Sequence, residues 1–316
     1  MGADRDRVEK AMLAAVKTSD DYLTEIASHL ISAGGKRLRP VMTIVASLVG
    51  DNEPGSATEN AIQGGIACEL VHLGSLYHDD VMDESTTRRG VETVNAKWGN
   101  LQAILAGDFL LARASEIAAS LGTEVAGLLA NTIGRLCEGQ IEELRFTYNV
   151  ARPVESYLLS IEGKTASLYG TAARIGGIVA GLDRRVVDSL TAYGTAYGMV
   201  FQIVDDILDI TSTDEALGKP AGHDMVEGVY TLPVMYTLAD GAAAADLRSM
   251  LGRPLKRRTQ RRALGIVRSG DGVARAITMA EEYVARAERA CDAMPQNAAT
   301  AALRAATATL LSSVAN

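Results

Sequence analysis

The chain of 316 residues has 47% hydrophobic and 22% charged residues, a balance that excludes a disordered or collagen-like protein and allows a sizeable core. Its formal charge is −8, from 31 basic and 39 acidic side chains, which excludes a protein whose main task is to coat nucleic acid. The 3 cysteines are far apart and form no CxxC pair, so neither a disulfide framework nor a zinc cluster is indicated.

The N-terminal residues 1–10 alternate in charge and show no apolar stretch behind a basic start, so we expect no secretory signal. The longest uncharged run, residues 189–204, is shorter than the roughly 20 apolar residues that a membrane-spanning helix needs. We therefore expect a cytoplasmic protein in a reducing compartment, without a spanning segment.

In chain order, apolar residues spaced three and four apart predict helices along nearly the whole sequence, for example over residues 125–136 and 273–294. Asp20 and Asp21 follow Ser19, where a helix N-terminus is expected. Clusters of Gly, Pro and Asp predict the breaks between helices, at residues 34–40, 51–55, 152–153 and 181–183. Strand-like alternation is scarce and no linker divides the chain. The prediction is an all-α fold in which residues 1–316 form a single helical domain.

Two segments interrupt this helical pattern. Residues 217–233 concentrate Gly and Pro and predict an ordered surface loop. Residues 256–262 hold five basic side chains, which we interpret as a solvent-exposed helix end without a function of its own.

Two acidic motifs of the form Asp-Asp-x-x-Asp stand in otherwise apolar helical stretches. They consist of Asp79, Asp80 and Asp83, and of Asp205, Asp206 and Asp209. Positions i and i+4 share a helix face, so the first and last aspartate of each motif point the same way with the middle one beside them. The apolar residues before each motif would draw these carboxylates toward the interior, where like charges need compensation.

Carboxylates about 4 Å apart repel by roughly 4 kcal/mol at an effective dielectric constant near 20, so six of them around one cavity require bound cations. Carboxylate ligands suit a hard divalent cation, and Mg²⁺ is usually held by one or two carboxylates together with substrate phosphates. The two motifs therefore predict magnesium and a diphosphate substrate.

Basic residues near the motifs support this prediction, because guanidinium and ammonium groups are the usual partners of phosphate oxygens. Arg88 and Arg89 follow the first motif, and Lys219 follows the second. Lys36 and Arg39 lie in the sequence GGKRLRP at a predicted helix start. Each cluster taken alone reads as ordinary surface charge. Their association with two acidic motifs favours diphosphate binding.

These motifs together resemble those of the all-trans polyprenyl diphosphate synthases, the head-to-tail chain-elongation family of isoprenoid synthesis. The similarity covers residues 33–294 and includes GGKRLRP, DDVMDESTTRRG, GDFLLARA, FQIVDDILD, GKPAGHD and the turn Gly163-Lys164-Thr165. It implies an all-α isoprenoid synthase fold around a central cavity, a homodimer and three Mg²⁺ ions. The implied substrates are an allylic diphosphate and isopentenyl diphosphate. The allylic diphosphate ionises, the cation adds to the alkene, and loss of a proton gives a chain that can react again.

The resemblance also assigns roles to single residues. All six aspartates of the two motifs would bind magnesium. Arg88, Lys164 and Lys219 would hold the allylic diphosphate, and Thr165 and Gln202 would line the reaction centre. Isopentenyl diphosphate would be held by Lys36, Arg39, His72 and Arg89. On spacing alone His72 would be a structural residue of an apolar helix, so its role rests on the resemblance.

Product length is expected to depend on an apolar tunnel below the first motif. Helical spacing puts Ser75 one turn below Asp79, with Val71 and Cys68 farther down. The resemblance adds Gly74, because short-chain members often carry aromatic residues at the two positions that Gly74 and Ser75 occupy. We therefore expect a long product, of octaprenyl to decaprenyl length, as used for a quinone side chain. Phe at either position should shorten the products.

Other functions remain open at this point. The chain could be a shorter-chain farnesyl or geranylgeranyl diphosphate synthase, or a non-catalytic partner subunit of a heteromeric synthase. A terpene cyclase would share the fold, but the complete second motif and the 4% aromatic content argue against it. Val229 stands where many relatives have a lysine, which removes one diphosphate contact. Peripheral membrane contact during product release is compatible with these features.

Overall fold

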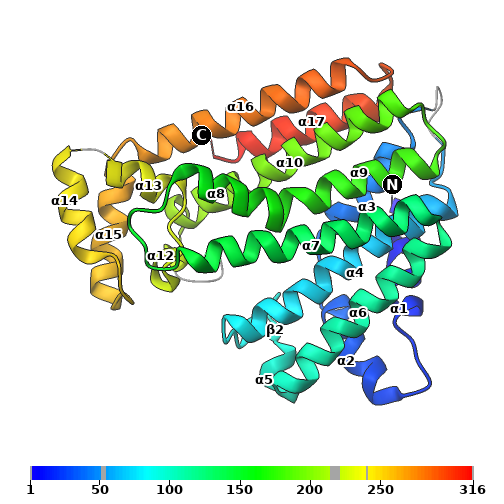
Figure 1. The fold of residues 1–316 in the computed structure, drawn as a ribbon, viewed down its shortest axis with the longest axis horizontal. Coiled ribbons are helices and arrows are strands. Elements are labelled where there is room, and N and C mark those ends of the chain that lie inside the picture. The colour runs from blue at the N-terminus through cyan, green and yellow to red at the C-terminus, as the bar shows by residue number, and fades with distance from the viewer. Residues whose placement is uncertain (1, 51–54, 214–220, 240, 315–316) are drawn as a thin grey trace. The chain divides into compact units, whose positions relative to one another are not determined.

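The computed structural model describes residues 2–50, 55–213, 221–239 and 241–314 (Figure 1). Contacts divide the chain into two compact units. The first unit comprises Met1–Ile133, Leu168–Gly194 and Ala293–Ala302, and the second comprises Gly134–Ser167, Thr195–Asp292 and Leu303–Asn316. The single domain expected for residues 1–316 stays a prediction.

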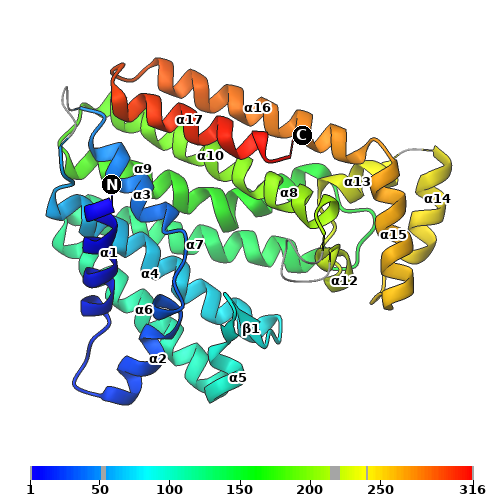
Figure 2. The ribbon, with the colours of Figure 1, turned by 180° about the vertical axis from the view of Figure 1, so that it is seen from behind.

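The first unit is built around helix α4. Its elements are α1 (Gly2–Ala15), α2 (Asp21–Ser32), α3 (Leu38–Ser47), α4 (Glu59–Met82), β1 (Thr87–Arg88), β2 (Val91–Glu92), α5 (Val94–Trp98), α6 (Asn100–Ser120) and nearly all of α9 (Ser167–Val179). Helix α4 packs against α1, α3, α5 and α6, as Figures 1 and 2 show from opposite sides. Thr58 caps α4 by accepting a hydrogen bond from the Ala61 amide.

The second unit has its own apolar core. Its elements are α8 (Val154–Ile161), the π-helix η1 (Glu162–Ala166), α12 (His223–Glu227), α13 (Leu232–Ala239), α14 (Gly241–Met250), α15 (Arg257–Ser269) and α16 (Gly272–Asp292). Helix α13 packs against α8, α14, α15 and α16 (Figure 2). Helices α7 (Thr123–Arg145), α10 (Arg184–Thr211) and α17 (Ala298–Ser312) contribute residues to both units.

The sequence-based prediction of an all-α protein is confirmed. Among the described residues, the strands amount to one hairpin, β1–β2, in which each strand has two residues. Three of the expected breaks lie between helices: residues 34–40 between α2 and α3, residues 152–153 between α7 and α8, and residues 181–183 between α9 and α10. The first break ends earlier than expected, because α3 begins at Leu38. Asp20 caps α2 by accepting from the amides of Tyr22 and Leu23. The five basic residues within 256–262 are exposed at the N-terminal end of α15, as expected.

Candidate active site

The first aspartate motif lies at the C-terminal end of α4. Asp79 and Asp80 belong to its last turn, and Asp83 is the residue that ends it, with its amide bonded to the Asp79 carbonyl at 2.8 Å. A helix C-terminus carries a partial negative charge, so carboxylates are unfavourable there unless a cation lies nearby. Asp83 is exposed, Asp79 is partly buried and Asp80 is buried.

Asp80 forms an ion pair with the β1–β2 hairpin. Arg88 Nε donates to Asp80 Oδ1 at 2.7 Å. The second oxygen, Oδ2, is buried and has no hydrogen-bond partner among the described residues. Burial raises the pKa of the Asp80 carboxyl, although the Arg88 charge opposes this shift. The middle carboxylate of the motif is therefore bound within the protein, while Asp79 and Asp83 lie nearer to solvent.

The hairpin also positions Arg89. Arg89 and Gly90 both have positive φ, 53° and 78°, as a two-residue type I′ turn requires. From this turn the Arg89 guanidinium donates to the carbonyls of Leu30, at 3.1 Å, and Gly34. Arg89 is thereby fixed beside the loop that contains GGKRLRP.

Arginines surround the His72 imidazole on α4. Burial, and then the charges of Arg39, Arg89, Arg88 and Arg37, lower the pKa of His72 well below its usual value, which keeps the ring neutral. Arg39 is buried, with its guanidinium 4.7 Å from the centre of the Tyr169 ring on α9. Its Nε has no hydrogen-bond partner among the described residues. The predicted residues Arg39, Arg88 and Arg89 thus form one cationic cluster around the neutral His72, suited to an anion.

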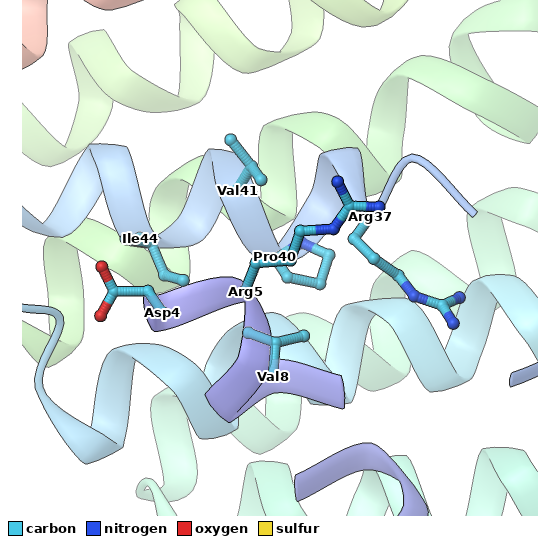
Figure 3. Close-up of a pocket in the computed structure, with 7 residues that line it drawn as sticks. All are labelled: Asp4, Arg5, Val8, Arg37, Pro40, Val41 and Ile44. Atoms are coloured by element: carbon cyan, nitrogen blue, oxygen red, sulfur yellow. The ribbon is translucent and has the colours of Figure 1, made fainter. Parts of the chain in front are cut away.

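Arg37 has a different role from its neighbours in GGKRLRP. Its guanidinium is buried and donates from Nε to Glu9 Oε1 at 2.7 Å and from Nη1 to Glu69 Oε1 at 3.3 Å. Figure 3 shows Arg37 beside a pocket lined by α1 and by α3 with the residue before it: Asp4, Arg5, Val8, Arg37, Pro40, Val41 and Ile44. The charge of Arg37 is therefore neutralised inside the protein, whereas Lys36 beside it is exposed.

The second aspartate motif lies near the C-terminal end of α10. Asp206 is buried and accepts from the Tyr157 hydroxyl, at 2.5 Å to Oδ2, and from Gln202 Nε2, at 2.8 Å to Oδ1. Burial and then the Asp224 charge raise the pKa of Asp206 well above its usual value. Asp209 is buried and accepts from the amides of His223 and Asp224 at 3.4 Å each, whereas Asp205 is exposed.

The residues Lys164 and Thr165 lie in the π-helix η1 of the same unit. Thr165 Oγ1 donates to Gln202 Oε1 at 2.8 Å, and Lys164 Nζ is paired with Glu143 Oε1 at 2.8 Å. Gly139 and Gly163 allow α7 and η1 to approach closely, since a Cβ on either glycine would collide with backbone atoms of the other segment. Single π-turns of this kind are frequent at functional sites. The structure thus brings Thr165, Gln202 and Asp206 together, with Lys164 next to Thr165 in η1.

The three positions expected to set product length have different surroundings on α4. Val71 is fully buried. A Cβ on Gly74 would lie 3.0 Å from the Gly107 carbonyl oxygen of α6 and 3.3 Å from the Leu111 side chain. Ser75 is partly buried and donates to the His72 carbonyl at 2.8 Å. Their role in product length stays a prediction.

The donor set fits a hard divalent cation, because it consists of aspartates that include a buried carboxylate oxygen without a hydrogen-bond partner, Asp80 Oδ2. Within the described part of the chain, no three His, Cys, Asp or Glu side chains lie close enough together to hold a metal by themselves. The metal-binding roles of the six aspartates stay predictions. Lys219 lies outside the described residues.

Comparison with known proteins shows the family. The family model named Polyprenyl synthetase matches residues 20–267. The chain belongs to the polyprenyl synthetase family. The nonaprenyl diphosphate synthase of Mycobacterium tuberculosis is 40% identical over 291 residues, which are 92% of this chain and 86% of that protein. Component 2 of the heptaprenyl diphosphate synthase of Geobacillus stearothermophilus is 38% identical over 302 residues, or 95% and 93% of the two chains.

Solved structures agree with this membership. The crystal structure of a polyprenyl synthase from Caulobacter crescentus, complexed with calcium and isoprenyl diphosphate, superposes with a TM-score of 0.91 at 31% identity. The match covers 98% of this chain and 95% of that one. The family member described here is thus a prenyltransferase with the all-α isoprenoid synthase fold, from a family that binds divalent metal. No described helix combines the length and apolar character that crossing a bilayer requires.

Several residues of these sites were missed by the sequence analysis. Tyr157, Glu143 and Tyr169 contact Asp206, Lys164 and Arg39, and no sequence motif points to them. Asp224 was part of the motif GKPAGHD, but its effect on Asp206 depends on how α12 returns toward α10.

Proposed function

We propose that this prenyltransferase condenses isopentenyl diphosphate with an allylic diphosphate repeatedly and releases an all-trans product of octaprenyl to decaprenyl length. The observation that carries the proposal is the family match over residues 20–267, with both aspartate motifs complete. The similarity to a nonaprenyl synthase and the small Gly74 and Ser75 before the first motif support a long product. Geranylgeranyl diphosphate synthases are also similar, so a shorter product is the alternative.

In this proposal each cluster performs one task. Arg39, Arg89 and the neutral His72, together with Lys36, bind the diphosphate of isopentenyl diphosphate. Arg88, Lys164 and Lys219 bind the allylic diphosphate as it leaves. Thr165 and Gln202 orient the reacting groups. The six aspartates would hold Mg²⁺ against that diphosphate. In the first motif Asp79 and Asp83 are more accessible than Asp80, and in the second motif Asp205 is more accessible than Asp206 and Asp209.

Magnesium, when bound, would neutralise charge on the departing diphosphate. The number of ions is taken as three from the resemblance. Cytoplasmic location is proposed on the same basis.

A homodimer is proposed as well. Leu101 and Leu105 on α6 are 74% and 66% exposed, and Ile104 beside them is 41% exposed. Exposed apolar groups at this spacing are typical of an interface. Light scattering of the wild type should give a particle mass of twice the chain mass, and Leu105→Glu should lower the measured particle mass. A monomeric wild type would contradict this part of the proposal.

The test of function is incubation of the purified protein with Mg²⁺, labelled isopentenyl diphosphate and primers of several lengths, followed by sizing of the dephosphorylated products. We expect products of forty to fifty carbons, and none after chelation by EDTA. Products of fifteen or twenty carbons would contradict the long-chain assignment.

A second candidate is a subunit that needs a partner chain, favoured by the similarity to a protein named as component 2 of a synthase. It predicts no elongation with any primer until a partner chain is added. Elongation by the purified chain alone excludes it.

A further inference from the structure

Tyr157 and Gln202 hold the Asp206 carboxylate from two sides. The Tyr157 ring is 1% exposed, and its hydroxyl donates to Oδ2 at 2.5 Å. Gln202 Nε2 donates to Oδ1 at 2.8 Å from one turn earlier on α10. Each oxygen of this buried carboxylate therefore has a donor with a fixed direction.

These bonds also fix the orientation of the Gln202 amide. Gln202 presents its NH₂ group to Asp206, because Nε2 donates to Oδ1, and this turns the amide oxygen of Gln202 away from the carboxyl group. Its Oε1 is then free to accept from Thr165 Oγ1, at 2.8 Å. The chain of bonds from Tyr157 through Asp206 and Gln202 to Thr165 thus connects α8, α10 and η1.

Tyr157 is itself held in place. The Arg152 guanidinium lies 5.8 Å from the centre of its ring and donates to Ser160 Oγ at 2.6 Å. An apolar side chain would fill the position of Tyr157 without bringing a hydroxyl next to a buried carboxylate. Buried polar networks are costly unless every member is paired, and when paired they specify one geometry. The Tyr157 hydroxyl therefore serves to orient the Asp206 carboxyl group, since an apolar side chain would be enough for packing alone.

We propose that Tyr157 is a positioning residue for the second aspartate motif: it orients Asp206 and, through Gln202 and Thr165, sets the geometry in which Asp205 meets metal and diphosphate. This inference rests on the proposed function of the motif. Tyr157 acts through Asp206 and does not touch substrate. Removing a residue that hydrogen-bonds to a metal ligand and orients it commonly lowers the metal affinity by about ten- to a hundredfold.

The test compares Tyr157→Phe with Tyr230→Phe. Tyr230 is also buried in the second unit, and its hydroxyl accepts from the Gly252 amide at 2.7 Å, so the control loses one partly buried hydrogen bond away from the aspartates. Binding of Mn²⁺ in the presence of pyrophosphate is measured by electron paramagnetic resonance. The Mg²⁺ concentration for half-maximal activity and the KM for isopentenyl diphosphate are measured beside it.

We expect Tyr157→Phe to weaken Mn²⁺ binding and raise the half-activating Mg²⁺ concentration about tenfold, with the KM for isopentenyl diphosphate unchanged. Adding Tyr157→Phe to Asp206→Asn should then have little further effect on Mn²⁺ binding. Equal Mn²⁺ affinities of Tyr157→Phe and Tyr230→Phe would overturn the inference.

An inactive wild type would overturn the proposed function and leave the Mn²⁺ comparison to decide about Tyr157. Should Tyr157→Phe lose its helical circular dichroism, 3-fluorotyrosine at position 157 keeps the ring and the hydroxyl and makes it a stronger donor. The Mn²⁺ affinity must then change, and an unchanged value also overturns the inference.

Discussion

Arg88 Nε donates to Asp80 Oδ1 across 2.7 Å, and this ion pair joins the β1–β2 hairpin to the end of α4. The Asp80 side chain is 1% exposed, whereas that of Arg88 is 28% exposed. Without the pair, the Arg88 guanidinium could still be solvated by water, whereas the Asp80 carboxylate would stay buried without a partner for Oδ1. Removing Arg88 would leave a buried negative charge next to Asp79.

Arg88→Ala is expected to lower the free energy of unfolding of the metal-free protein by about 1–3 kcal/mol, because it leaves a buried acceptor without its partner. Arg184→Ala is the matched control, since Arg184 pairs with Glu124 on the surface, where an ion pair contributes roughly 1 kcal/mol or less. Urea unfolding in EDTA measures both. Equal losses in the two variants would show that the Asp80 pair is no stronger than a surface pair.

The Arg88→Ala defect should also depend on pH. The pKa of Asp80 is raised in the folded protein by burial, so the ionised form destabilises the fold, and that destabilisation is present above the folded pKa. As pH falls toward the unfolded value near 4, Asp80 becomes protonated and the defect should shrink. Urea unfolding of both proteins from pH 7 to pH 4 tests this. A defect that grows on acidification would contradict it.

Ser75→Phe is the sharper test of product length. Ser75 is partly buried, whereas Gly74 packs against the α6 backbone, where a Cβ would lie 3.0 Å from the Gly107 carbonyl oxygen. We expect Ser75→Phe to shorten the products in the elongation assay. Gly74→Phe should instead force α4 away from α6 and lose solubility. Gly74→Ala is the control, with a cost of about 1–3 kcal/mol and unchanged products. Full-length products from a folded Ser75→Phe protein would refute its place in the tunnel.

The helices, their breaks and the Asp20 cap follow from local sequence, because capping and turn chemistry act over a few residues. The different roles of Arg37 and Arg39 within GGKRLRP do not follow from local sequence. Arg37 turns inward because its backbone is left-handed, with φ 52°, and because Glu9 and Glu69 meet it there. No local pattern distinguishes it from Arg39.

The same limit applies inside the aspartate motifs. In the first motif the middle aspartate is buried apart from the other two, as helical spacing suggests, but in the second motif Asp209 is buried together with Asp206. Spacing also cannot show that Asp80 meets Arg88 or that Asp206 meets Tyr157. Tyr157 and Asp206 are 49 positions apart in the sequence, and their contact depends on the packing of α8 against α10. Contacts of this range are set by tertiary structure, which is why the positioning residues were missed.

His72 should report diphosphate binding directly. Its pKa is lowered by burial and by the Arg39, Arg89, Arg88 and Arg37 charges, so the free ring should stay neutral well below pH 6.5. A bound diphosphate brings negative charge beside these arginines and should raise the pKa of His72. Nitrogen-15 spectra of the ring, assigned with His72→Gln, measure the titration with and without pyrophosphate. An unchanged titration with pyrophosphate bound would place the anion away from His72.

The cysteines should divide into one reactive and two protected thiols. Burial raises the pKa of Cys68 to about 12 and that of Cys291 to about 11, whereas Cys137 is exposed on α7. At pH 8 roughly one Cys68 in ten thousand would be the reactive thiolate, and burial also blocks its access to reagent. We expect a disulfide reagent to modify one thiol quickly in the native protein and all three in guanidinium. Cys137→Ser should abolish the fast phase. A fast phase that survives in this variant would mean that Cys68 or Cys291 opens to solvent in the native state.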